Sequence, residues 1–119
     1  MRLLLASLLF AGCAASVTAT PVNAPPTRMV RRAPLDVEIF TAGAPTRPHT
    51  DVAILEAEPG FSERSTADLV ARMRENAAAN GCDGLVITGV DTQTFRHGDE
   101  KKTVTGTCIV WSAPAVAQP

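Results

Sequence analysis

The sequence is poor in aromatic residues and histidine, and neither sign of charge is in clear excess. Its 119 residues include no tyrosine, one tryptophan, two histidines, 11 Lys and Arg, and 12 Asp and Glu. Nucleic-acid-binding proteins normally carry a basic surface, and those that bind single strands add aromatic rings on which bases stack. The balanced charge and the scarcity of aromatic rings therefore exclude nucleic-acid binding.

The sequence also lacks the motifs of common catalytic sites. It contains no Gly-x-Ser-x-Gly turn, no glycine-rich phosphate loop and no Cys-x-x-Cys pair. The two histidines, His49 and His97, lie in predicted loops, where no nucleophile and acid complete a triad. His49 with Asp51, or His97 with Asp99, offers a metal only two ligands, so metal binding is the weaker alternative to an ordinary turn. We predict no enzymatic activity, no metal site and no cofactor.

The N-terminal apolar stretch, Leu3 to Phe10, is too short to span a bilayer. It follows the positive Arg2 and precedes two small residues and Cys13. This arrangement resembles the lipobox of bacterial lipoprotein signal peptides, with Phe10 where leucine is more usual. The resemblance implies that residues 1–12 are a signal peptide and that Cys13 is acylated and becomes the first residue of the mature chain. An ordinary cleaved signal with a chance cysteine is the alternative.

Acylation of Cys13 would determine the cellular compartment in which the protein resides. Several acyl chains, palmitate among them, hold a protein durably on a membrane. The residue after Cys13 is Ala14 and not aspartate, which in lipoproteins of this type favours the outer membrane of a Gram-negative host. We therefore expect a protein on the periplasmic face of the outer membrane. Its expected partners are the membrane itself, an envelope protein or a second copy, with no small-molecule substrate.

The segment 13–34 is expected to be an extended tether. Proline fixes φ and has no N–H donor, so a proline-rich stretch cannot build a helix or a central strand. The prolines spaced through it are Pro21, Pro25, Pro26 and Pro34. Three arginines near its end form either a solvated cluster or a patch for anionic polymers: Arg28, Arg31 and Arg32.

Residues 35–111 are expected to form one small domain, and residues 112–119 a disordered tail. Polar and apolar residues alternate over 35–39, and a more continuous apolar stretch over 51–58 is stopped by Pro59 and the glycine after it. Both patterns indicate β-strands.

A helix is predicted between Ser65 and Gly81. Ser65, with Asp68 three residues later, resembles a capping box, and the Asn-Gly pair that ends at Gly81 is a typical left-handed stop. The apolar residues at helical spacing, which we expect to be buried, are Leu69, Val70, Met73 and Ala77.

Two further strands are predicted over 85–90 and 103–111, joined by the polar stretch 92–102. Within that stretch Gly98 and the aspartate after it indicate a hairpin turn. The order strand, strand, helix, strand, strand predicts an α+β fold: a single four-stranded sheet with one helix packed on one face (β-β-α-β-β).

Cys82 and Cys108 form an even pair in a compartment where disulfides persist. Cys82 follows the helix directly, and a hairpin about Gly98 returns Cys108 to the start of the third strand. We predict a disulfide between them; two buried free thiols or a metal pair are the alternatives.

The charged tip of the same hairpin is either a solvated turn or a surface that contacts a partner. The candidate contact residues are Arg96, His97, Asp99 and Lys101.

The domain resembles RcsF-like and YbjQ-like domains. The resemblance rests on the runs Val37-Glu38-Ile39-Phe40, Asn80-Gly81-Cys82-Asp83-Gly84-Leu85-Val86-Ile87 and Gly106-Thr107-Cys108-Ile109-Val110-Trp111. It implies a non-catalytic envelope lipoprotein that binds a partner or senses envelope stress. A structural, self-associating envelope lipoprotein is the alternative. The chain has two domain cysteines where RcsF-like domains have four.

Overall fold

The computed structural model describes residues 16–60 and 65–112. The expected signal segment 1–12, the expected lipid attachment at Cys13 and residues 113–119 of the expected tail lie outside the described residues.

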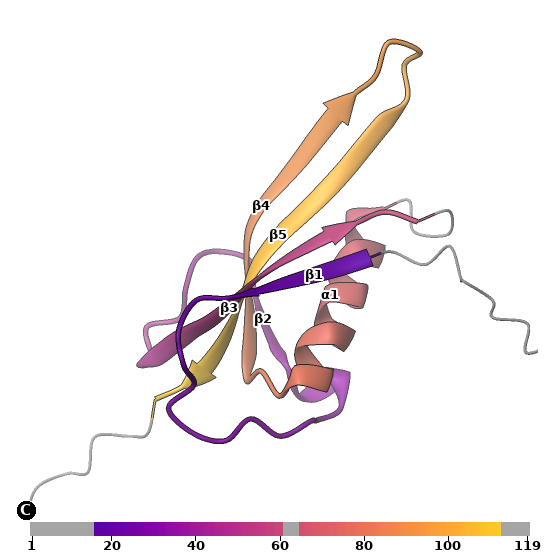
Figure 1. Ribbon diagram of the computed structural model, residues 1–119. Helices are drawn as coiled ribbons and strands as arrows, with labels where there is room; N and C mark the ends of the chain where they lie inside the picture. The colour runs from indigo at the N-terminus through magenta and orange to yellow at the C-terminus, as the bar shows by residue number, and fades with distance from the viewer. Residues whose placement is uncertain (1–15, 61–64, 113–119) are drawn as a thin grey trace, which may run out of the picture.

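Within the described residues, five strands form one mixed sheet, and one α-helix packs on one of its faces (Figure 1). The strands follow the spatial order β1-β3-β5-β4-β2. All neighbouring pairs are antiparallel except β2 and β4, which are parallel. Their bounds are β1 (Ser16–Pro21), β2 (Glu38–Phe40), β3 (His49–Glu58), β4 (Gly84–Thr94) and β5 (Glu100–Trp111).

The prediction of a four-stranded sheet is wrong, because β1 adds a fifth strand. β1 comes from inside the segment expected to be a tether, and it pairs along the edge of β3 from Ser16 opposite Glu58 to Pro21 opposite Ala53. Its β-branched residues suit a strand, and its proline is the last residue of an edge strand, where a missing donor is tolerated. Prolines therefore exclude a central strand here but not an edge strand.

The first predicted domain strand, 35–39, is also only partly a strand. The proline at position 34 begins a 3₁₀ turn, η1 (Pro34–Asp36), which leaves Leu35 84% exposed. β2 then pairs with β4 over three residues only. Val37, just before β2, is fully buried. The alternation is therefore correct for Val37 and wrong for Leu35, because the strand starts at Glu38 and not at position 35.

The helix, α1 (Thr66–Asn80), has the ends that the sequence predicts. The Ser65 hydroxyl accepts a hydrogen bond from the Asp68 N–H at 3.1 Å, and the Asp68 carboxylate accepts one from the Ser65 N–H at 3.4 Å. Gly81 ends the helix at φ 84°. A Cβ on Gly81 would lie 2.6 Å from the backbone nitrogen of Val30, so this glycine also permits close packing of the N-terminal segment.

The core lies between α1 and the sheet face that it covers. Leu69, Met73 and Ala77 on the helix are at most 1% exposed. Opposite them, Gly106 on β5 leaves room for Met73, because a Cβ at this position would lie 2.9 Å from the methionine sulfur. The sheet supplies the other fully buried residues of this face, among them Leu55, Leu85 and Val104.

The segment between β1 and η1 lies against the end of the helix. The Arg32 N–H donates to the Ala78 carbonyl at 3.0 Å. The Arg32 guanidinium also pairs with the Asp83 carboxylate at 2.6 Å. Arg32 is therefore a partner in an ion pair that fixes this segment, and not part of a solvated cluster.

Candidate functional site

The outer halves of β4 and β5 form a two-stranded arm that extends beyond the rest of the sheet (Figure 1). On one side, β2 pairs with β4 only as far as Val86. On the other side, β3 pairs with β5 only as far as Val104. Beyond these points β4 and β5 pair with each other, out to Thr94 opposite Glu100. Every residue from Thr88 to Glu100 is exposed.

The tip of the arm holds most of the candidate contact residues. Its turn is closed by two backbone hydrogen bonds, from the Phe95 N–H to the Asp99 carbonyl at 2.8 Å and from the Gly98 N–H to the Phe95 carbonyl at 3.0 Å. Arg96 and His97 lie in this turn and are exposed, like Asp99. The structure therefore brings three of the four predicted residues into one tight loop.

The fourth predicted residue, Lys101, lies next to the outer end of β5, opposite Gln93, but its side chain reaches back toward the rest of the sheet. It belongs to β5, and its ammonium nitrogen is 3.4 Å from a carboxylate oxygen of Glu58. Because both side chains are partly exposed, this pair contributes little stability. Lys101 is oriented toward the end of β3 and is less available at the tip.

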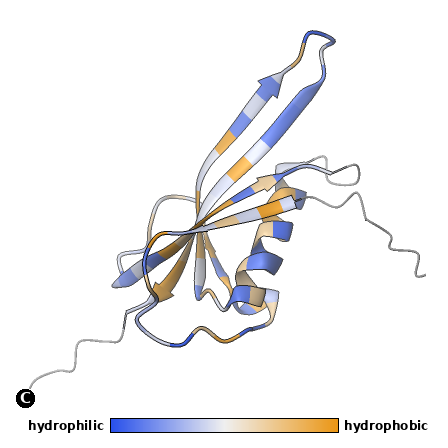
Figure 2. Cartoon of the chain, viewed as in Figure 1, coloured by the Kyte–Doolittle hydropathy of each residue, from blue (hydrophilic) through white to orange (hydrophobic). Residues whose placement is uncertain are grey.

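Phe95 is a feature of the tip that the sequence analysis missed. This residue directly follows β4 and is 49% exposed, inside a stretch that is otherwise mainly hydrophilic (Figure 2). Single exposed apolar side chains are common on protein surfaces. A lone aromatic residue within the polar run 92–102 was the signal that could have indicated this position.

The predicted disulfide between Cys82 and Cys108 is confirmed. The two Cα atoms are 5.6 Å apart, and both residues are 1% exposed. Cys108 lies opposite Leu85 on β4, so the bond joins the end of the helix to the middle strand of the sheet. Its burial makes it a structural bond rather than an accessible redox group.

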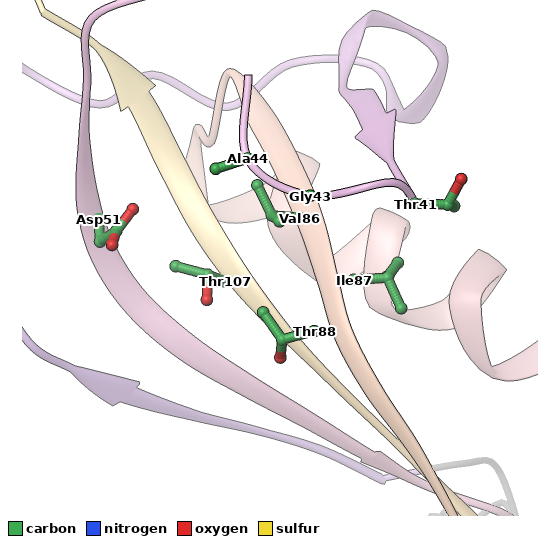
Figure 3. A pocket seen from close by; sticks show the side chains of 8 residues that line it. All are labelled: Thr41, Gly43, Ala44, Asp51, Val86, Ile87, Thr88 and Thr107. Atoms are coloured by element: carbon green, nitrogen blue, oxygen red, sulfur yellow. The ribbon is translucent and has the colours of Figure 1, made fainter. Parts of the chain in front are cut away.

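A hollow of about 450 Å³ lies on the sheet face opposite the helix, under the connection from β2 to β3 (Figure 3). This connection, residues 41–48, has to pass across β4 and β5 because β2 and β3 lie on different sides of them. The lining residues are Thr41, Gly43, Ala44, Asp51, Val86, Ile87, Thr88 and Thr107. Asp51 is the one ionisable residue among these eight.

His49 lies beside this hollow, but its contacts are those of a packed side chain. Its Nδ1 donates to the Arg47 carbonyl at 2.8 Å, so in the neutral ring Nε2 carries the lone pair. Nε2 is 3.6 Å from the Asp51 carboxylate, a contact that attracts only the protonated ring. The pair supplies neither an activated nucleophile nor a complete ligand set. Across residues 16–60 and 65–112, no group of three or more His, Cys, Asp or Glu side chains could hold a metal ion.

Trp111 packs against the connection from β2 to β3. The Arg47 guanidinium lies 4.4 Å from the centre of the indole ring, and the Phe40 ring meets it edge to face at 6.0 Å between centroids. Cation–π and edge-to-face contacts each contribute roughly 0.5–1 kcal/mol. This cluster holds the crossing connection against the sheet, and we assign it a structural role.

The comparisons with known proteins give one similarity in fold. No family model matches the chain, and no curated protein matches it in sequence. The fold is similar to the crystal structure of a Francisella virulence factor, FvfA, in its orthorhombic form, with a TM-score of 0.56 over 78% of this chain and 96% of that chain. The two sequences are 7% identical, so the similarity shows a shared fold alone. In the part of the chain that the structure describes, no helix is long and apolar enough to cross a membrane.

Proposed function

We propose that this chain is a lipid-anchored envelope protein that works by binding and not by catalysis. The export segment supports the anchor: a short apolar stretch, two small residues and Cys13 resemble a lipobox. Ala14 after the cysteine favours the outer membrane, with the domain on its periplasmic face. The β4–β5 arm carries the binding part of the proposal.

Ordering the arm costs conformational free energy that its own few buried contacts do not offset, so a contact with another molecule would account for it. Its exposed residues, Thr88 to Glu100, gain little from burial, whereas ordering each of them costs about 1–2 kcal/mol of backbone entropy. An isolated two-stranded ribbon is only marginally stable in water. Exposed loops on a rigid scaffold are where binding residues concentrate. We therefore assign the arm, with Phe95, Arg96, His97 and Asp99 at its tip, as the contact surface.

This arrangement suits a sensor. A small domain anchored to the membrane would detect a change in the envelope as a change in the molecules that its arm contacts. The resemblance to RcsF-like lipoproteins supports this role, and the buried disulfide would keep the domain folded in an oxidising compartment.

Two measurements test the proposal. Wild-type protein should incorporate a palmitate analogue in cells, and Cys13→Ser should abolish this incorporation together with normal signal cleavage. A photocrosslinking amino acid at Arg96 or His97 should then form adducts with a protein or lipid of the envelope, identified by mass spectrometry. The same group at Leu35 is the control, because Leu35 is 84% exposed and lies away from the arm.

Two results would contradict the proposal. An unacylated wild-type protein would remove the anchor. Equal adducts from Arg96 and Leu35 would show that the arm has no special contact.

A structural, self-associating role is the second candidate, and the edge of β4 favours it. Residues Ile87 to Thr94 have no neighbouring strand on their outer side among the described residues, because β2 covers only Gly84–Val86. Such an edge presents unpaired backbone groups to which a second copy can add in an antiparallel, two-fold arrangement. Sedimentation of the domain would show a dimer that Thr92→Pro dissociates. A monomer at all concentrations would reject this candidate.

A further inference from the structure

Only two residues separate Cys13 from the folded sheet. β1 begins at Ser16, and consecutive Cα atoms are about 3.8 Å apart, so the Cα atoms of Cys13 and Ser16 are at most about 11 Å apart. β1 is held firmly, because its six residues pair with β3 and the Val22 N–H donates to the Val52 carbonyl at 2.9 Å. A lipid on Cys13 would therefore hold the sheet itself close to the membrane.

The arm leaves the sheet at the end where β1 begins. Ser16 lies opposite Glu58 at the end of β3, and the neighbouring Ala57 lies opposite Val104. Val104 is the last β5 residue paired with β3, so the arm begins there. The start of β1, the end of β3 and the base of the arm thus form one row across the sheet, and the arm extends past this row (Figure 1).

Measured from this row along the direction of β1, the tip of the arm extends about as far as the chain can span from Ser16 to Cys13. A strand rises about 3.4 Å per residue, so Val104 to Glu100 spans about 14 Å before the turn. Adjacent strands are rotated by about 20–25°, and two such steps turn β5 by about 45° from β1. Along the direction of β1 the arm therefore reaches about 10 Å past the row, against about 11 Å for the chain to Cys13.

The chemistry of the tip fits the polar surface of a bilayer. Phe95 is 49% exposed, and phenylalanine is among the side chains that interfacial elements bury at the boundary between headgroups and acyl chains. Arg96 in the tip and Lys102 on the adjoining strand are positively charged, which favours anionic lipids, although Asp99 and Glu100 offset much of this charge. Attachment at Cys13 would raise the effective concentration of the surface at the tip to the millimolar range, so the tip needs little affinity of its own.

We propose that the tip of the arm, Phe95 to Asp99, contacts the phospholipid headgroup layer of the same membrane leaflet that holds the lipid on Cys13. This inference rests on the proposed function, because only the acyl chains bring the tip to the surface. The domain would then contact the membrane at two points, the N-terminus of β1 and the tip of the arm, and the rest of the sheet would lie away from the surface.

Tryptophan quenching by brominated lipids tests this contact. Acylated full-length protein is placed in vesicles of phosphatidylethanolamine and phosphatidylglycerol with brominated acyl chains. Wild-type protein, whose one tryptophan is Trp111, sets the baseline. The emission added by Phe95→Trp should be quenched at least twofold more than the emission added by Leu35→Trp. Leu35 is the matched control because it is exposed and precedes β2, which pairs with the end of β4 far from the arm.

The outcomes separate this inference from the proposed function. Equal quenching of the two added tryptophans, with the acyl chains on Cys13 confirmed by mass spectrometry, would overturn the membrane contact and leave the anchor intact. A native chain without acyl groups would overturn both. Quenching-free but blue-shifted emission from Phe95→Trp would show that a protein, either a partner or a second copy, covers the tip, and would also overturn the inference.

Discussion

The carboxylate of Asp83 lies 2.6 Å from the guanidinium of Arg32, 51 positions earlier in the chain. Its other oxygen accepts a hydrogen bond from the Trp111 backbone N–H at 2.8 Å. One side chain therefore fastens the N-terminal segment and the last strand to the turn that follows the helix. The Asp83 side chain is 16% exposed and that of Arg32 32%, so solvent screens this pair less than a surface pair.

Asp83→Ala should lower the free energy of unfolding by about 2 kcal/mol, because it leaves a partly buried guanidinium and a backbone N–H without their acceptor. Asp83→Asn keeps an acceptor for the Trp111 N–H and should cost about half as much. Urea denaturation measures both, with Arg28→Ala as a control expected within about 0.5 kcal/mol of wild type. Equal costs for the alanine and asparagine variants would show that the charge, and not the hydrogen bond, dominates.

Loss of the disulfide should destabilise the domain by about 3 kcal/mol, the loop-closure term for cysteines 26 positions apart. Cys82→Ala and Cys108→Ala each remove the whole crosslink, so the double variant should lose little more than either single variant. Denaturation without reductant measures the stabilities. Free alkylation of both thiols in the native protein would contradict the bond.

Two glycines with nearly the same φ should respond differently to alanine. Gly98 at 80° has open space around it, so Gly98→Ala should cost only the left-handed backbone strain, about 1 kcal/mol. Gly81 at 84° lies against the backbone of Val30, so Gly81→Ala should cost at least about 2 kcal/mol. Thermal unfolding compares the two variants. Similar midpoints would mean that the N-terminal segment does not pack on the helix end.

The two histidines should also differ. His97 is exposed in the turn of the arm, so His97→Ala should change stability by less than about 0.5 kcal/mol. The His49 side chain is 18% exposed, donates to the Arg47 carbonyl and meets the Trp111 ring edge to face, so His49→Ala should cost about 1 kcal/mol. Stoichiometric zinc or copper that binds the wild-type protein but not a variant carrying both His49→Ala and His97→Ala would show that these residues bind metal.

Local signals predicted the elements that depend on neighbours in sequence. The capping box at Ser65, the left-handed end at Gly81 and the turn at Gly98 each involve residues only a few positions apart, and each is observed. The disulfide could also be predicted, because the hairpin brings Cys108 back to the start of β4.

Pairing between distant segments could not be predicted in the same way. β1 is stabilised by β3, whose paired residues lie 32 to 42 positions later, and the prolines that follow β1 gave a stronger local signal than its β-branched residues. The parallel pairing of β2 with β4 likewise leaves no local pattern, because three residues are too few to show a period. The length of the arm depends on where β2 and β3 end, which the sequence of β4 and β5 alone does not specify.

The position of β5 has a consequence for the order in which the protein is built. Among the described residues β5 is the last strand in chain order, yet it is the middle strand of the sheet, and it carries Cys108. Until β5 has been synthesised, β3 and β4 both lack the strand with which they share most of their pairs, so the full sheet assembles only after β5 is available. The disulfide also forms only once β5 is present, because Cys108 lies on this strand.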